Sequence, residues 1–180
     1  MAKTGLKYPV AAPYTAGAHT AGKVIGKAIS ASASINVAEG SLYADDGLAE
    51  SVKEFTSGTI TVGLDEMDDD IAVMLLGHTM GEDNELVAKD NDFAPYVGVG
   101  FYGARVKDGK KSYKAIWYPK VQFKEPNEDL TTKGENITFG TYTIEGTLMR
   151  DDAGEWRRSK ICDTEEEARA WLEGKAKITA

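Results

Sequence analysis

The sequence is poor in the residues on which much enzyme and metal chemistry depends. It contains one cysteine, Cys162, and two histidines, His19 and His78. A single thiol cannot form a disulfide within the chain, so nothing indicates an oxidising compartment. The same scarcity leaves no Cys/His set for zinc and no Cys–His pair for nucleophilic catalysis. We therefore expect a protein that is not an enzyme and that holds no metal and no cofactor.

Long apolar runs are also missing. The N-terminus, MAKTGLKYPVAAPYTAG, has no uninterrupted apolar stretch of the kind that a signal peptide needs. No other run approaches the roughly 20 apolar residues of a membrane-spanning helix. The sequence predicts a protein that is made in the cytoplasm and does not enter a membrane.

Basic residues are outnumbered, with 21 Lys and Arg against 29 Asp and Glu and a net charge of −8. General nucleic-acid binding needs a basic surface that displaces counterions from phosphates, so this class is disfavoured. The charge is uneven: residues 1–38 have four lysines and no acids, whereas residues 39–92 have fifteen acids and two lysines. Two interpretations remain open, an ordinary solvated surface and complementary faces that meet a second copy of the chain.

Two patterns resemble ligand sites but lack the required context. Residues 98–103, GVGFYG, have the GxGxxG spacing, but the dinucleotide motif stands between a strand and a helix. Here the glycines lie in a predicted strand that runs to a hairpin turn, where they favour sheet curvature or a close approach. The acidic cluster at 65–70 lacks the register of a calcium loop and is better explained as the start of a helix.

Residues 1–22 mix glycines, prolines and small residues without a period, which predicts a flexible N-terminal arm. Residues 23–180 are of a length that fits a single domain. In residues 25–37, mostly apolar residues at the odd positions alternate with small and polar residues at the even positions, which predicts a long strand. Residues 60–64 alternate in the same way. We expect residues 41–53, SLYADDGLAESVK, to form a polar and acidic connection between these two strands.

The following segment predicts a helix with Asp65 or Asp68 as its N-cap and Gly77 at its end. Strands then resume at 97–101, and Asp108-Gly109 predicts a hairpin turn. Residues Tyr113 to Phe123 follow, with the odd positions expected on one face. A second hairpin turn is predicted at 152–154, and Thr164 to Glu167 form a capping box that opens a short C-terminal helix. The fold class predicted is mainly β: an antiparallel β-sandwich or partly closed barrel with one flanking helix and a short terminal helix.

Taken in order, six stretches resemble the major tail proteins, or tail tube proteins, of long-tailed phages. They are KAISASASINVAEG, SLYADDGLAES, DDDIAVMLLGHTMG, APYVGVGFYGARV, YKAIWYPKVQF and ITFGTYTIEGTLMR. The likeness spans roughly residues 23–162, and it depends on the order of the stretches because no one of them is diagnostic alone.

The resemblance implies a β-sandwich with a flanking helix, of which six copies form a ring. Stacked rings make the hollow tail tube through which phage DNA is ejected without specific binding, and net acidity suits such a conduit. The expected location is the virion, and the expected partners are copies of the chain and the tape-measure, tail-tip and tail-terminator proteins. The family has no catalytic residues to transfer. A phage-tail-like bacteriocin, a contractile tail and a virion decoration or binding module remain as alternatives.

The candidate contact residues between subunits lie in the expected arm and in the acidic connection. They are Tyr8 and Tyr14 in the arm, and Tyr43, Asp45, Asp46 and Glu50 in the connection. We expect attraction between the basic arm of one copy and the acidic connection of another to link rings. The long strand at 25–37, without an obvious local partner, is expected to pair across a subunit boundary.

Overall fold

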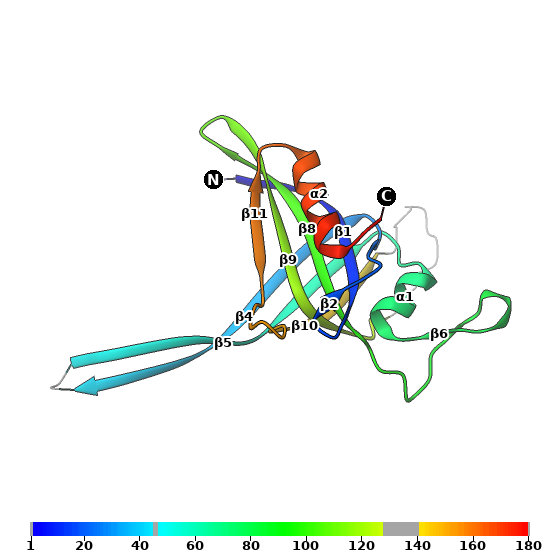
Figure 1. The fold of residues 1–180 in the computed structure, drawn as a ribbon, viewed down its shortest axis with the longest axis horizontal. Helices are drawn as coiled ribbons and strands as arrows, with labels where there is room; N and C mark the ends of the chain where they lie inside the picture. Colours follow the sequence, from blue (N-terminus) through cyan, green and yellow to red (C-terminus); the bar gives the residue numbers. More distant parts are fainter. Residues whose placement is uncertain (1, 45–46, 128–140, 180) are drawn as a thin grey trace, which may run out of the picture.

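The computed structural model describes residues 2–44, 47–127 and 141–179. Figure 1 shows a mainly antiparallel β fold with two α-helices, as the sequence predicts. The elements in chain order are β1 (Ala2–Thr15), β2 (Ala18–His19), β3 (Lys23–Val24), β4 (Ala28–Ala44), β5 (Gly47–Leu64), α1 (Asp69–Leu76), β6 (Thr79–Met80), a 3₁₀ turn (Glu82–Asn84), β7 (Leu86–Val87), β8 (Tyr96–Lys107), β9 (Lys110–Lys124), β10 (Tyr142–Met149), β11 (Arg158–Cys162) and α2 (Glu165–Ala176).

One antiparallel sheet contains all the long strands, in the order β2-β1-β8-β9-β10-β5-β4. The sheet bends so that residues 23–28 link its two sides. Val24 of β3 pairs with Val10 of β1, and Ala28 at the start of β4 pairs with Leu64 of β5. The described strands therefore form a partly closed barrel rather than a closed one.

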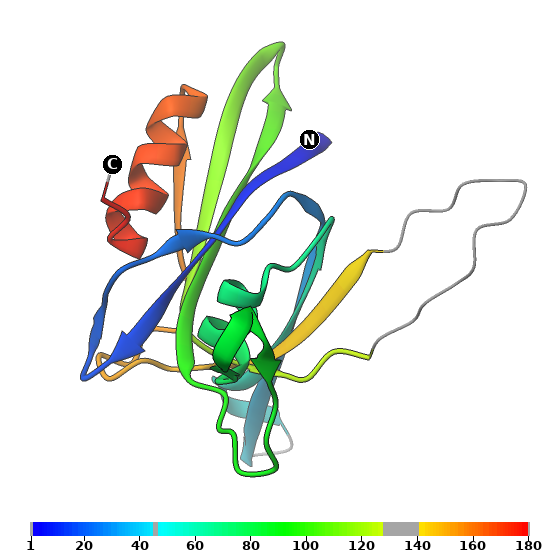
Figure 2. The ribbon, with the colours of Figure 1, turned by 90° about the vertical axis from the view of Figure 1, so that its right-hand side faces the viewer.

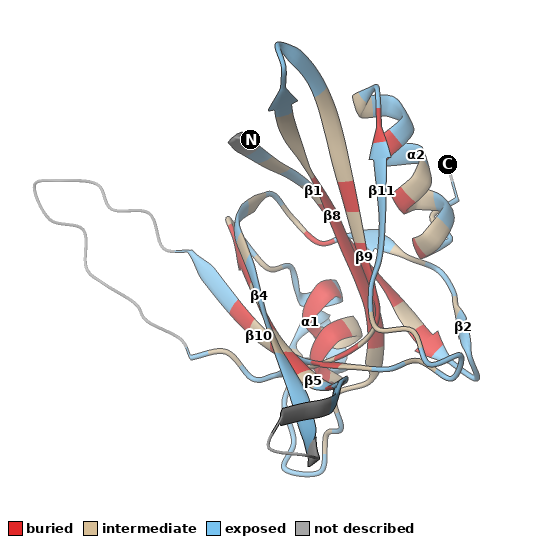
Figure 3. Cartoon of the chain, turned by 90° about the vertical axis from the view of Figure 1, so that its left-hand side faces the viewer, coloured by how far each residue is buried: buried red, intermediate tan, exposed pale blue. Residues whose placement is uncertain are grey.

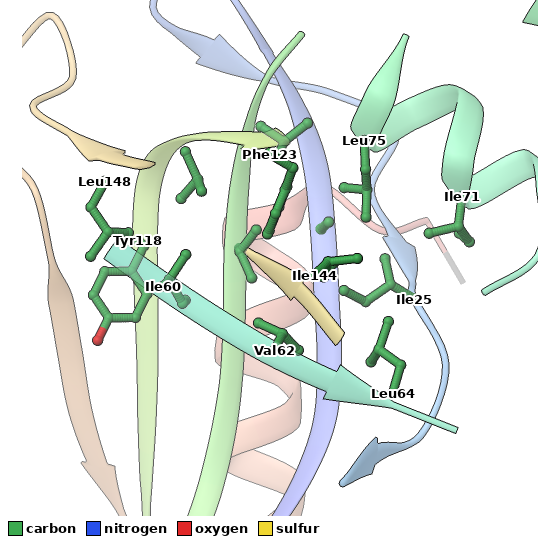
Figure 4. Packing of buried hydrophobic residues seen from close by; sticks show 14 of the residues in the cluster. Ile25, Ile60, Val62, Leu64, Ile71, Leu75, Tyr118, Phe123, Ile144 and Leu148 are labelled. Carbon is green, nitrogen blue, oxygen red and sulfur yellow. The ribbon is translucent and has the colours of Figure 1, made fainter. Parts of the chain in front are cut away.

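The concave side of the sheet holds the larger hydrophobic core, and α1 covers it. Asp68 is the N-cap of α1, and Gly77 ends the helix in the left-handed region at φ 82°, a conformation that glycine adopts without strain. Figure 4 shows Ile71 and Leu75 of this helix among the buried side chains of the core. Burying each such side chain stabilises the fold by roughly 1.5–3 kcal/mol.

The convex side of β1, β8 and β9 holds a second core under α2 (Figure 2). The side-chain hydroxyl of Thr164 accepts a hydrogen bond from the Glu167 N–H, which confirms the predicted N-cap. Leu172 and Ala168 of α2 are fully buried in the same cluster as Trp117. Both faces of the central strands are therefore covered.

The strand β9 differs from the prediction that residues 113–123 present one apolar face. Val97 pairs with Val121 and Val99 pairs with Tyr118, so two residues of β9 lie opposite Gly98. This bulge reverses the side-chain alternation. Consequently Ala115 and Trp117 pack under α2, whereas Val121 and Phe123 lie in the concave core.

The prediction of a flexible N-terminal arm is wrong for residues 2–15. They form β1, which pairs with β8 from Ala2 to Pro13, and Val10, Ala11 and Ala12 are completely buried. Val10 lies in the core under α2 and Ala11 in the concave core, so β1 supplies both. Two of the residues that suggested an arm, Gly5 and Pro9, fall at the two register shifts, between Thr4 and Leu6 and between Lys7 and Val10.

The expected polar connection at 41–53 is also corrected. Residues 28–44 and 47–64 form one long hairpin of β4 and β5, paired as far as Ala44 and Gly47. The strand that begins at Ala28 therefore has a partner within its own chain along its whole length. The turn predicted at 152–154 is present, but it joins no hairpin, since β10 and β11 both pair antiparallel with successive parts of β9.

Candidate functional site

The outer part of β4 and β5, residues 37–44 and 47–54, extends beyond the body of the protein (Figure 1). We call it the projecting hairpin. Its side chains from 37 to 42 and from 50 to 54 are all exposed (Figure 3). A two-stranded hairpin without a packed face is marginal in water, so this element indicates a surface that another molecule completes.

Aromatic stacking fixes the hairpin at its base. The ring of Phe55 stacks on the indole of Trp156 with centroids 4.7 Å apart and planes 2° from parallel. The Arg150 guanidinium lies 5.8 Å from the Phe55 ring centroid and also donates a hydrogen bond to the Phe55 carbonyl oxygen. These contacts hold the outer strands in a defined direction, since Phe55 itself is largely buried.

One face of the projecting hairpin combines apolar and acidic side chains. Leu42 is opposite Glu50, Gly40 is opposite Val52, and Ala38 is opposite Glu54. Directly opposed residues and every second residue share a face, so Leu42 and Val52 are diagonal neighbours flanked by Glu50 and Glu54. Leu42 is 59% exposed and Val52 is 55% exposed. On the other face, Glu39 forms an ion pair with Lys53.

The outer edge of β4 is the second feature of the site. β4 is the last strand in the sheet order, and no described strand pairs with the edge that faces away from β5. Ile29 and Val37 on this strand are 53% and 50% exposed. An edge of this length with apolar side chains favours pairing with another strand.

The structure divides the predicted contact residues. Tyr43 in β4 and Glu50 in β5 lie on the projecting hairpin, whereas Asp45 and Asp46 lie outside the described residues. Tyr8 and Tyr14 instead serve the fold of their own chain. The Tyr8 hydroxyl donates to Glu173 Oε1 at 2.7 Å, and the Tyr14 hydroxyl accepts from the Asp152 N–H at 3.1 Å.

The expected attraction between a basic arm and an acidic connection is weakened, because Lys7 and Lys23 have partners in the same chain. Lys7 lies 3.0 Å from Glu165, and Lys23 lies 3.2 Å from Asp70.

The sequence did not predict a role for Leu42, Val52 and Glu54. The pair Asp46-Gly47, a common hairpin signal, could have identified the element that carries them.

The two ligand-like patterns have structural explanations. The glycines of 98–103 lie within β8, which runs on to the Asp108-Gly109 turn. Asp65 accepts the backbone N–H of Lys27 at 2.8 Å, and this hydrogen bond is the main cause that lowers its pKa. Asp68 caps α1, with Asp69 and Asp70 in its first turn. Among the described residues, no group of three or more His, Cys, Asp or Glu side chains is arranged to hold a metal ion.

The buried imidazole of His78 lies between two carboxylates at the end of α1, those of Asp92 and the more exposed Glu125. Its Nδ1 lies 3.1 Å from Asp92 Oδ2 and its Nε2 lies 3.1 Å from Glu125 Oε2. Burial lowers the pKa of His78, but the hydrogen bonds to Asp92 and Glu125 outweigh it, and the pKa is raised. The cluster ties the segment after α1 to the end of β9.

The chain matches no protein-family model, and a search of curated proteins finds no relative. No helix in the described part of the chain has the length and apolar character that crossing a membrane requires.

Proposed function

We propose that this chain is a structural subunit that assembles with copies of itself into a hollow tube of the phage-tail kind. In this proposal six copies form a ring, the rings stack, and DNA passes through the lumen without specific binding. The assembled tube belongs to a virion, and the tape-measure, tail-tip and tail-terminator proteins are its further partners. The proposal starts from the resemblance of the sequence to tail tube proteins.

The observation that carries the proposal is the projecting hairpin. It exposes Leu42 and Val52 on one face, and the described part of the chain supplies nothing that covers them. Folding alone does not favour an element that adds exposed apolar area and little core. Contact with another subunit provides a reason for it, because burial of apolar surface there stabilises the assembly by about 25 cal/mol per Å².

The edge of β4 supports the same proposal. Subunits placed side by side in a ring can extend a sheet across their boundary, which satisfies backbone groups that an edge strand leaves open. The exposed apolar side chains Ile29 and Val37 lie on this strand. A closed ring removes every such edge at once, whereas an open dimer removes only some of them.

Sedimentation and negative-stain microscopy at rising protein concentration test the proposal. Tubes of constant width built of stacked rings are the expected result. The matched control replaces residues 39–53 by Asn-Gly, a two-residue turn that follows the Ala38–Glu54 pair and leaves the Phe55 base intact. This shortened chain should fold and remain monomeric. A full-length chain that stays monomeric at every concentration, also when mixed with a tail-tip complex, would contradict the proposal.

A further inference from the structure

A cationic pocket lies between the end of α2, the turn joining β1 to β2 and the loop that follows β10. Its volume is about 290 Å³. Its charged lining residues are three cations, Arg158, Lys175 and Lys177, and one carboxylate, Asp151, and the imidazole of His19 lies beside them. The floor is formed by Trp117 and Pro119, whose carbonyl oxygen lies 2.7 Å from His19 Nε2.

The positive charge of this pocket is only partly offset by its own chain. Burial lowers the pKa of Lys175, and the positive charge of Arg158 lowers it further. Burial is also the main cause that lowers the pKa of His19, to which Arg158 and Lys175 add. Glu155 is engaged by Arg158, and Asp151 Oδ1 accepts the N–H groups of Ala153 and Glu155. A carboxylate from outside would therefore be attracted.

The projecting hairpin carries the complementary charge. Glu50 and Glu54 share the face on which Leu42 and Val52 are exposed. Neither glutamate forms an ion pair with a described residue of its own chain, in contrast to Glu39 on the other face. The hairpin extends away from the body (Figure 1), and both glutamates are exposed, so a neighbouring molecule can reach their carboxylates.

We propose that the cationic pocket of one copy binds the carboxylates of Glu50 and Glu54 of a second copy. This contact rests on the proposed function and gives the projecting hairpin a receptor on the next subunit. It takes the place of the basic arm, whose Lys7 and Lys23 are paired within the chain. The charge pairs select the partner and its orientation, while Leu42 and Val52 supply apolar burial.

Charge reversal on each side tests the contact. The pocket variant is K175E/K177E and the hairpin variant is E50K/E54K. Each should raise the protein concentration at which half of the chain sediments as polymer by about tenfold or more. A chain with all four changes should return to within about twofold of wild type, because the pairs are restored with opposite sign. The matched control K107E/K110E changes the same charge at the β8–β9 turn and should assemble like wild type.

The outcomes separate the contact from the proposed function. Circular dichroism and the sedimentation of the monomer identify variants that fold, and K175Q/K177Q replaces the pocket variant where reversal unfolds it. Normal assembly of a folded pocket variant overturns the contact while tube formation stands. The contact is also overturned if the variant with all four substitutions does not regain assembly. A third result also overturns the contact: wild type binds inorganic phosphate, the pocket variant does not, and both assemble equally well. The pocket would then be a site for small anions. A monomeric wild type refutes the proposed function itself.

Discussion

The indole ring of Trp117 lies directly against the backbone of Gly98 in the neighbouring strand. A β-carbon on Gly98 would lie 2.3 Å from Trp117 Cζ2, and one on Gly100 would lie 2.6 Å from Trp117 Cε3. Gly100 is also the residue that pairs with Trp117 across β8 and β9. The spacing of these two glycines is therefore explained by the ring that covers them, which requires neither a nucleotide nor a tight turn.

Substitution of Gly100 by alanine tests this packing. The added methyl group would also meet Leu172 Cδ2 at 2.7 Å and the Ile116 carbonyl oxygen at 2.9 Å, so backbone as well as side chains must move. Overpacking of this kind costs about 1–3 kcal/mol of unfolding free energy. Gly103→Ala is the matched control in the same strand, because its nearest neighbour is an oxygen at 3.7 Å. Urea unfolding of both variants measures the difference, and equal stability would disprove the close packing.

The His78 cluster predicts a dependence of stability on pH. Carboxylates of Asp92 and Glu125 face both ring nitrogens, and only the imidazolium donates to both. The Lys89 N–H also donates to Asp92 Oδ2, and this bond is the main cause that lowers the pKa of Asp92. The pKa of His78 is raised above the ordinary value of 6.5. Its stabilisation is complete below pH 6.5 and is lost as the pH rises through the folded-state pKa.

The free energy of unfolding of wild type should accordingly fall as the pH rises above about 6.5, and H78Q should remove that slope. The other histidine provides the control, because burial lowers the pKa of His19. Its contribution is present above the unfolded pKa and is lost as the pH falls through the folded one. H19Q should therefore change the slope below pH 6.5 and leave the slope above it. If the unfolding free energy of H78Q falls with pH as steeply as that of wild type, the His78 cluster is not the cause of the pH dependence.

The sequence predicts best where local chemistry decides the structure. Asp68 and Gly77 bound α1 as expected, Thr164 caps α2, and Asp108-Gly109 turns the chain from β8 into β9. Each of these signals acts within a few residues. The class of fold follows from the same local signals, because alternating strands joined by short turns favour antiparallel pairing.

Long-range pairing decided the features that were predicted wrongly. β1 carries glycine and prolines, and its place beside β8 depends on contacts about ninety residues away, such as that of Val10 with Gly100. In β9, apolar residues stay at odd positions on both sides of the bulge, but after the bulge they lie on the other face of the sheet. Both faces can take apolar residues because a helix covers each of them. For the candidate site, Tyr43 and Glu50 lie in β4 and β5, so the sequence did not predict that the element that carries them is a hairpin.

Substitution of Leu42 and Val52, the exposed apolar pair of the projecting hairpin, should affect assembly but not folding. Leu42→Ser with Val52→Ser removes two side chains that are 59% and 55% exposed, so the unfolding free energy should change by less than about 0.5 kcal/mol. Polymerisation should weaken clearly, because contact with a neighbour would bury these side chains. Val106→Ser, at a position 43% exposed in β8, is the control. Sedimentation detects the effect, and unchanged assembly of the double variant would exclude an apolar contact there.

The N-terminal strand gives the most direct contrast between sequence and structure. A flexible arm at 1–22 predicts that its removal leaves a folded monomer. Because β1 lies between β8 and β3 and buries Val10, Ala11 and Ala12, we expect removal to abolish the cooperative unfolding transition and the near-UV circular dichroism signal.

Single substitutions refine the test. Ala11→Asp places an unpaired carboxylate in the concave core and should cost several kcal/mol, a large part of the roughly 5–15 kcal/mol that stabilises a domain. Thr15→Asp, at an exposed position of the same strand, should cost less than about 1 kcal/mol. Two results together would show that residues 2–15 act as an arm. The truncated chain would unfold in one sharp transition, and the two aspartate variants would have similar stabilities. Separation of the two variants by several kcal/mol would instead establish β1 as part of the core, because only the buried position loses the hydration of its charge.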